Sequence, residues 1–291
     1  MSVATRFETF LSNIALTPAQ KDAGTERRES VVERLNSNYW NSSSKTNNSI
    51  FVGSWAKQTR IRPPRDVDVL FKLPWSVYTR FEGRTGNKQS QLLQEVKGVL
   101  AAKFGATAIK GDGPVVIIPF TSYSVELIPA FAFDDGRYYI SMTDNGGRYK
   151  SADYHAEETY IKDSDTATKG NTRELIRMMK AWQGYCSVPI KSFWLEIIAA
   201  EFLSSWEHKG KSRMWYDWMV RDFLAHLKGR RFGTIYAPGT YESMPLGEAW
   251  YSKASMAYDR AKKACELEAT DAPAAGDEWQ KIFGTDIPKY P

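Results

Sequence analysis

Two aspartates in an otherwise apolar stretch are the first residues of this chain whose types and spacing could do chemistry. Asp66 and Asp68 lie in the sequence DVDVLF. Side chains alternate between the two faces of a β-strand, so both carboxylates would point one way while Val67 and Val69 point the other way. Adjacent carboxylates repel, and each raises the affinity of the other for a proton or a cation. The pair predicts a Mg²⁺ site with hard oxygen ligands; a solvated strand end is the alternative when the motif stands alone.

A third carboxylate stands in a similar apolar run. Glu126 lies in the sequence SYSVELIPAF, where Val125 and Leu127 would share the face opposite to it. Three carboxylates on neighbouring strands can hold two metal ions about 3.5–4 Å apart, which clamp the attacking and leaving oxygens of an in-line phosphoryl displacement. The alternative is an acid that faces solvent on a half-exposed strand.

A glycine and a serine precede the aspartates. Gly53 lets the backbone approach a phosphate closely, and Ser54 offers both an N–H and a hydroxyl. If SWAKQ opens a short helix, its N-terminus adds partial positive charge aimed at a triphosphate. The dipeptide alone carries little weight. Followed by DxD and then by a strand acid, it predicts a nucleotide site.

The surrounding sequence must supply the elements that position these residues. The first half reads as mixed α and β, and the pattern from residue 171 onward is helical. The sequence predicts helices over residues 3–16, 18–39, 89–104, 171–184, 189–206, 214–227 and 244–266, and strands at 50–52, 67–72, 114–120 and 123–133. The tail after Ala269 reads as irregular. We expect a catalytic lobe over 1–165 and a helical lobe over 166–291, with a hinge near 145–170.

Composition places limits on the class of protein. The chain has 291 residues, 42% of them hydrophobic, which is enough for one large domain or two lobes that share a cleft. A net charge of +5 suits polyanionic substrates such as nucleotides or RNA. Two cysteines without a CxxC motif, no secretory leader and no long apolar run predict a cytoplasmic protein without a membrane span.

The combined pattern resembles a known superfamily. Gly53-Ser54, Asp66-Val67-Asp68 and Glu126 follow one another as in the polymerase-β-type nucleotidyltransferases. The longer stretches GSWAKQTRIRPPRDVDVLFKLP, VELIPAF, LIRMMKAWQ and IKSFWLE resemble the bacterial CD-NTases, the SMODS-type relatives of cyclic GMP–AMP synthase and oligoadenylate synthetase. The resemblance covers about residues 1–230.

This resemblance implies an α+β fold, with a polymerase-β-like nucleotidyltransferase lobe and a C-terminal helical lobe, similar to that of oligoadenylate synthetase, closing over the nucleotide. It implies two Mg²⁺ ions, which Mn²⁺ could replace, and NTP substrates with ATP among them. The implied product is a cyclic di- or trinucleotide second messenger, sensed by a downstream effector in antiphage defence.

The resemblance also implies roles for individual residues. Asp66, Asp68 and Glu126 would be the metal ligands, with Glu126 also the base for the acceptor hydroxyl, although this third acid is often aspartate in relatives. Lys180 resembles a lysine that contacts the triphosphate tail; the alternative is a solvated basic stripe. Ser192-Phe193 resembles a pair whose hydroxyl meets phosphate and whose ring stacks on a base, and Phe193 could equally pack in the core.

Two other functions are compatible with the same residues. A nucleotidyltransferase that modifies an RNA, a protein or a small molecule would share the three acids. A non-catalytic sensor would bind nucleotide or RNA without turnover. The basic run at 228–231, with lysines and an arginine at 209–213, permits an RNA activator without indicating one.

Overall fold

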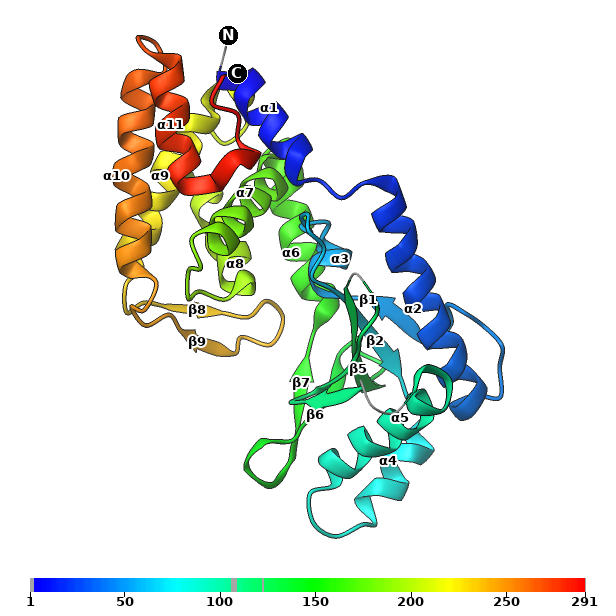
Figure 1. The fold of residues 1–291 in the computed structure, drawn as a ribbon. Coiled ribbons are helices and arrows are strands. Elements are labelled where there is room, and N and C mark those ends of the chain that lie inside the picture. Colours follow the sequence, from blue (N-terminus) through cyan, green and yellow to red (C-terminus); the bar gives the residue numbers. More distant parts are fainter. Residues whose placement is uncertain (1–2, 106–108, 122, 291) are drawn as a thin grey trace. The chain divides into compact units, whose positions relative to one another are not determined.

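The computed structural model describes residues 3–105, 109–121 and 123–290, and the chain forms two compact units (Figure 1). The sheet unit comprises Leu16–Gln58 and Pro64–Glu158. The helical unit comprises Met1–Ala15, Thr59–Pro63 and Thr159–Pro291. Helix α6 (Tyr154–Ala167) crosses from one unit to the other along the chain.

The sheet unit is built on seven strands in the order β1-β2-β5-β4-β3, with β6 paired to β5 and β7 to β6. The β2–β5 pair is parallel and the others are antiparallel. The strands are β1 (Ser49–Phe51), β2 (Asp66–Lys72), β3 (Lys110–Asp112), β4 (Val115–Ile118), β5 (Ser124–Ala132), β6 (Tyr138–Met142) and β7 (Arg148–Ala152). Its helices are α2 (Pro18–Tyr39), α3 (Gly53–Lys57), α4 (Trp75–Glu82) and α5 (Lys88–Phe104).

The two faces of this sheet have different roles. Odd-numbered residues of β2, such as Val67 and Val69, are fully buried in a core that includes apolar side chains of α2 and α5. On the other face, Leu70 and Ile128 belong to a second apolar cluster. That face becomes acidic toward the start of β2, because the even-numbered positions there are aspartates. The alternation predicted for this strand is confirmed.

Helix α2 begins as the sequence predicts. Thr17 is the N-cap, its side chain accepts a hydrogen bond from the Gln20 backbone N–H, and the Gln20 side chain accepts one from the Thr17 N–H. Pro18 occupies the first helical position, where no backbone donor is needed.

The helical unit has one apolar core, and Figure 1 shows its last two helices side by side. Its elements are α1 (Val3–Ile14), α7 (Asn171–Tyr185), α8 (Ser192–Ser205), α9 (Tyr216–Gly229), the hairpin of β8 (Thr234–Tyr236) and β9 (Ser243–Pro245), α10 (Tyr251–Leu267) and α11 (Ala272–Phe283). No helix among the described residues is long and apolar enough to cross a membrane.

The compact units differ from the division expected at 1–165 and 166–291. Helix α1 lies in the helical unit because Phe7, Phe10 and Ile14 are buried in its core. The fully buried Arg6 also donates hydrogen bonds to the carbonyls of Ala272, Pro288 and Lys289. An apolar helix stripe at the start of the sequence does not reveal which core it will join.

Two expectations for the C-terminal part were wrong. The tail is not irregular, since α11 follows Asp271, whose side chain caps the Ala274 backbone N–H. The helix expected over 244–266 begins only at Tyr251, because residues 243–245 form β9.

Candidate active site

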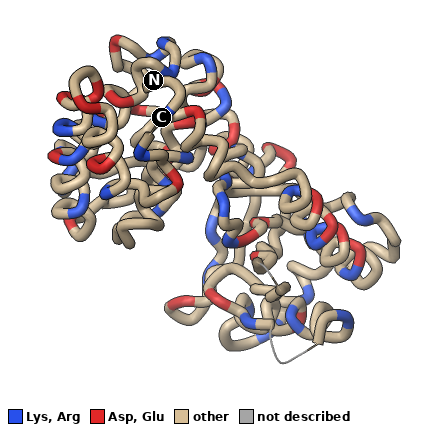
Figure 2. Tube along the Cα trace, turned by 45° about the horizontal axis from the view of Figure 1, so that its top comes forward, with Lys and Arg blue, Asp and Glu red and all other residues tan. Residues whose placement is uncertain are grey.

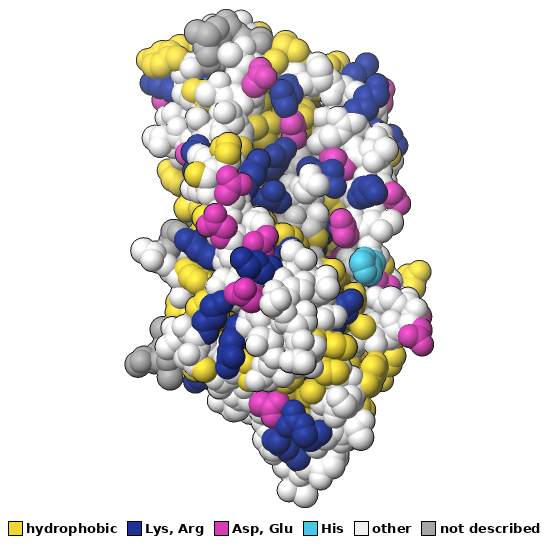
Figure 3. Space-filling model, turned by 90° about the vertical axis from the view of Figure 1, so that its right-hand side faces the viewer, with side chains coloured by type: hydrophobic (Ala, Val, Ile, Leu, Met, Phe, Trp, Pro, Cys, Tyr) yellow, Lys and Arg dark blue, Asp and Glu magenta, His cyan; other side chains and the backbone are white. Residues whose placement is uncertain are grey.

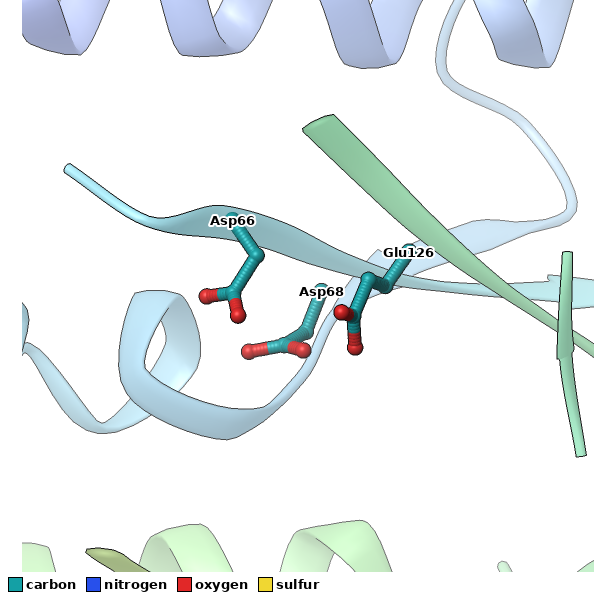
Figure 4. A group of neighbouring side chains, drawn as sticks. All are labelled: Asp66, Asp68 and Glu126. Carbon is teal, nitrogen blue, oxygen red and sulfur yellow. The ribbon is translucent and has the colours of Figure 1, made fainter. Parts of the chain in front are cut away.

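The parallel pairing of β2 and β5 brings the three predicted acids together. Asp68 lies opposite Glu126 in the register, and Asp66 lies opposite Ser124. One carboxylate oxygen from each of the three acids lies within 4.8 Å of the others. Figure 4 shows the three side chains gathered on one side of the strands. The group is one that could hold a metal ion.

Electrostatic repulsion marks this cluster. Burial raises the pKa of the Glu126 carboxyl above its ordinary value, and the charges of Asp66 and Asp112 raise it further. A carboxyl in this state binds either a proton or a cation more readily than an isolated one. The cluster is therefore electrostatically prepared for a positive ion.

Gly53 lies against the second aspartate of the cluster. Its φ is +55°, in the left-handed region, and a Cβ atom placed there would lie 2.3 Å from Asp68 Oδ2. No side chain fits at that distance, so the glycine is required both by backbone conformation and by space. The predicted proximity of the glycine turn to the acids is observed.

The turn and the short helix α3 are bonded to β2 and to α6. The Val52 N–H donates to the Asp68 carbonyl at 3.1 Å, and Trp55 Nε1 donates to the Asp66 carbonyl at 2.9 Å. The buried Lys57 forms an ion pair with Glu157 at 3.2 Å. We did not predict Trp55, Lys57 or Glu157 from the sequence. The aromatic residue just after Gly53-Ser54 was the available signal for the first of them.

Lys180 has partners within the helical unit. Its ammonium lies 2.5 Å from Glu196 Oε1 and 2.9 Å from Thr59 Oγ1, and Thr59 donates to the same Glu196 oxygen at 2.8 Å. All three residues are buried. Lys180 is therefore not part of a solvated basic stripe. Its contact with a triphosphate stays a prediction. Thr59 and Glu196 carried no sequence signal of this network.

Ser192 and Phe193 open helix α8, also in the helical unit. The Ser192 hydroxyl donates to Gln183 Oε1 at 2.8 Å. Phe193 is half-buried and packs against the core of the unit. Their contacts with nucleotide likewise stay predictions.

The basic run at 228–231 is largely paired. Arg230 forms an ion pair with Glu201 at 3.2 Å, and Arg231 forms one with Glu248. Lys and Arg alternate with Asp and Glu along the helical unit (Figure 2). On the face seen in Figure 3, basic side chains again lie beside acidic ones. These contacts give an RNA activator no added support.

Comparison with known proteins identifies the family. The model of the Second Messenger Oligonucleotide or Dinucleotide Synthetase domain (SMODS) matches residues 1–165, more than half of the chain. The chain belongs to this family. The resemblance inferred from Gly53, Asp66, Asp68 and Glu126 is confirmed.

Relatives and solved structures agree with this assignment. The chain is 20% identical to a probable cyclic nucleotide synthase of Bacillus cereus, with 83% of this chain and 82% of that protein covered. The structure of Escherichia coli CdnC with ATP matches at a TM-score of 0.72 and 17% identity, covering 99% of each chain. Vibrio cholerae DncV, a cyclic AMP-GMP synthase bound to nonhydrolyzable GTP, matches at 0.66 and 15%, covering 98% of this chain and 86% of DncV. The SMODS chain thus has the mixed α and β fold of these proteins, as predicted.

Proposed function

We propose that this SMODS protein is a nucleotidyltransferase that condenses NTPs into a cyclic di- or trinucleotide second messenger. The observation that carries the proposal is the convergence of Asp66, Asp68 and Glu126 beside Gly53. The names of the similar proteins, a probable cyclic nucleotide synthase and a cyclic AMP-GMP synthase, support this reaction class. The proposed biological role of the product is a signal in antiphage defence.

The donor set fits a divalent metal. Three carboxylates supply hard oxygen ligands. Burial and then the charges of Asp66 and Asp112 raise the pKa of Glu126, and a cation would relieve that repulsion. Asp66, Asp68 and Glu126 would hold the two proposed Mg²⁺ ions, for which Mn²⁺ could substitute. When bound, the ions would supply charge stabilisation for phosphoryl transfer between aligned oxygens.

The chain's own residues would bind and orient the nucleotides and accept a proton. A Glu126 carboxylate oxygen would accept the proton of the attacking hydroxyl as a general base. Gly53 and Ser54 would let the backbone approach the phosphates. In the helical unit, Lys180 and Ser192 would contact the triphosphate, and Phe193 would stack on a base. Holding the attacking and leaving groups of the two nucleotides in line would contribute much of the rate enhancement.

Incubation with mixed NTPs and Mg²⁺, followed by mass spectrometry, tests the proposal. We expect a small phosphatase-resistant product from the parent protein. The double variant Asp66→Ala/Asp68→Ala should make none while keeping its fold, because it removes repulsion rather than packing. Asp134→Ala/Asp135→Ala is the matched control, since it removes two exposed acids of the same unit and should retain activity.

The same assay separates the alternative functions. A product that appears only when an RNA, protein or small-molecule acceptor is added would indicate transfer to that acceptor. Nucleotide binding without any product would indicate a sensor. Synthesis at the parental rate by the Asp66→Ala/Asp68→Ala variant would overturn the metal assignment.

A further inference from the structure

Next to the candidate metal site, the edge of β2 that pairs with β1 bonds to a side chain instead of a strand. β1 pairs with β2 in antiparallel fashion as far as Phe51, which lies opposite Val69. The following Val52 N–H still donates to the Asp68 carbonyl at 3.1 Å. At Gly53 the chain turns into α3, so β1 ends before it reaches Asp66.

An indole completes the ladder that β1 leaves unfinished. Carbonyls of alternate residues point to the same side of a strand, so the Asp66 carbonyl faces the same edge as that of Asp68. Trp55 Nε1 donates to this Asp66 carbonyl at 2.9 Å. A side chain of α3 therefore makes the bond that the next residues of β1 would have made.

We infer that Trp55 is a positioning residue that holds Asp66 in the metal-binding arrangement, an inference that rests on the proposed function. Asp66 is the first residue of β2, and the ends of elements are where structure opens most easily. Its carboxylate also lies among like charges, since one oxygen from each of Asp66, Asp68 and Glu126 lies within 4.8 Å of the others. β2 pairs with β5 along one edge, where Asp66 lies opposite Ser124, and the indole adds a bond on the other edge at this strand end. Fixing its backbone in advance lowers the ordering cost of binding a metal.

The indole itself is held by two neighbours. Trp55 is 7% exposed and stacks on Phe51, with ring centroids 5.2 Å apart and planes at 17°. The second neighbour is Gly24 of α2, where an added Cβ would come within 2.1 Å of Trp55 Cη2 and 2.5 Å of Cζ2. A glycine inside a helix costs about 1 kcal/mol relative to alanine. Room for the indole explains why α2 carries glycine at this position.

Titrating the protein with Mn²⁺ alone tests this role, because it requires no enzymatic activity. The electron paramagnetic resonance signal of free Mn²⁺ measures how much of the ion is bound. Trp55→Phe keeps an aromatic ring but loses the N–H, and we expect its Mn²⁺ affinity to fall roughly 10-fold, as for partners of metal ligands in other sites. Trp40→Phe is the matched control. Trp40 Nε1 donates to the Lys72 carbonyl at 2.9 Å, at the other end of the same strand, so its loss should leave Mn²⁺ affinity unchanged.

A second pair of variants displaces the indole without altering it. Gly24→Ala should weaken Mn²⁺ binding as Trp55→Phe does, because the new methyl group pushes the ring off Asp66. Gly98→Ala in α5 is its control, since a Cβ there meets nothing within 4 Å. The double variant Gly24→Ala/Trp55→Phe should bind Mn²⁺ as weakly as Trp55→Phe alone, because the two atoms that clash are absent from phenylalanine.

The outcomes separate this inference from the proposed function. If Asp66→Asn/Asp68→Asn abolishes Mn²⁺ binding but Trp55→Phe and Gly24→Ala, both folded by circular dichroism, bind like the parent, Trp55 has no positioning role and the metal site stands. Equal losses in Trp55→Phe and Trp40→Phe would also overturn the inference. If the parent binds Mn²⁺ no better than Asp66→Asn/Asp68→Asn, the metal site itself fails, and the role of Trp55 fails with it.

Discussion

The space between Gly53 and Asp68 is the tightest feature of the candidate site at the scale of single residues. The chain passes so close to the Asp68 carboxylate that even a methyl group would overlap it. Two requirements meet at this position, a left-handed backbone and an absent side chain, and a substitution would ordinarily violate both at once.

Gly53→Ala should reduce synthesis by about 100-fold or more, because displacing a reacting group by about 1 Å can cost that much. The measurement is the rate of product formation at saturating NTP and Mg²⁺. Gly113→Ala isolates the steric part, since Gly113 has a φ of +58° but nothing within 4 Å of an added Cβ. A loss of the same size in both variants would mean that backbone strain, rather than overlap with Asp68, is responsible.

Glu126 predicts a pH dependence of stability in the absence of metal. Its pKa is raised in the folded protein, so its stabilising contribution is complete below the unfolded pKa and is lost as pH rises through the folded pKa. With a chelator present, Glu126→Gln should therefore have a higher Tm than the parent at pH 7–8, and this gain should shrink toward pH 4. Thermal unfolding across that range checks it. A gain that does not vary with pH would contradict the assigned cause.

At the scale of elements, the sequence was most informative where its alternation was strict. The apolar and acidic positions of β2 and β5 predicted the strands, the shared face and the three acids, because a period of two leaves few other structures. The sequence could not reveal the Trp55 bond to Asp66 or the burial of Lys180, since both depend on how separate elements pack against one another. Helix α11 was missed because its proline and glycine suggested a loop, whereas Pro273 lies in the first turn.

The Lys180–Glu196 pair links α7 and α8 inside the helical unit. Lys180 is 7% exposed and Glu196 is 3% exposed. Lys180→Met should destabilise the unit by about 3–5 kcal/mol, because it leaves a buried carboxylate without its cation. Lys180→Met/Glu196→Leu removes both charges and should recover most of that loss. Urea unfolding measures both variants.

The double variant also tests the predicted triphosphate contact of Lys180. If that contact exists, the double variant should recover stability but show a raised KM for NTP. A double variant as unstable as Lys180→Met would show that the unpaired Glu196 charge is not the cause of the destabilisation. Lys103→Met, which breaks the exposed pair with Glu33, serves as a control and should change stability by no more than about 0.5 kcal/mol.

At the scale of the whole molecule, the segment that joins the glycine turn to the first acid belongs partly to the helical unit. Between Ser54 and Asp66 the chain enters the helical unit at Thr59–Pro63 and then returns to the sheet unit. Within the helical unit, Thr59 is bonded to Lys180 and Glu196, and the Arg62 N–H donates to the Ile14 carbonyl at 2.7 Å. The segment between the glycine turn and the first acid is thus anchored in a core other than that of the acids.

Substitution of Arg6 tests whether the N-terminal helix α1 contributes to the stability of the helical unit. Besides its bonds to three carbonyls, Arg6 Nε lies 3.1 Å from the nearly buried Glu268 Oε1. Arg6→Met would leave that carboxylate without its cation and should cost about 3–5 kcal/mol. Hydrogen exchange measured by mass spectrometry should then rise in α1, α10 and α11 but not in β2 and β5, whose apolar residues belong to separate cores. Arg148→Met, which breaks only an exposed pair with Asp144, should leave exchange unchanged in both units. Equal acceleration in β2 and β5 would mean that the two units unfold together, and the assignment of α1 to one of them would then have no energetic meaning.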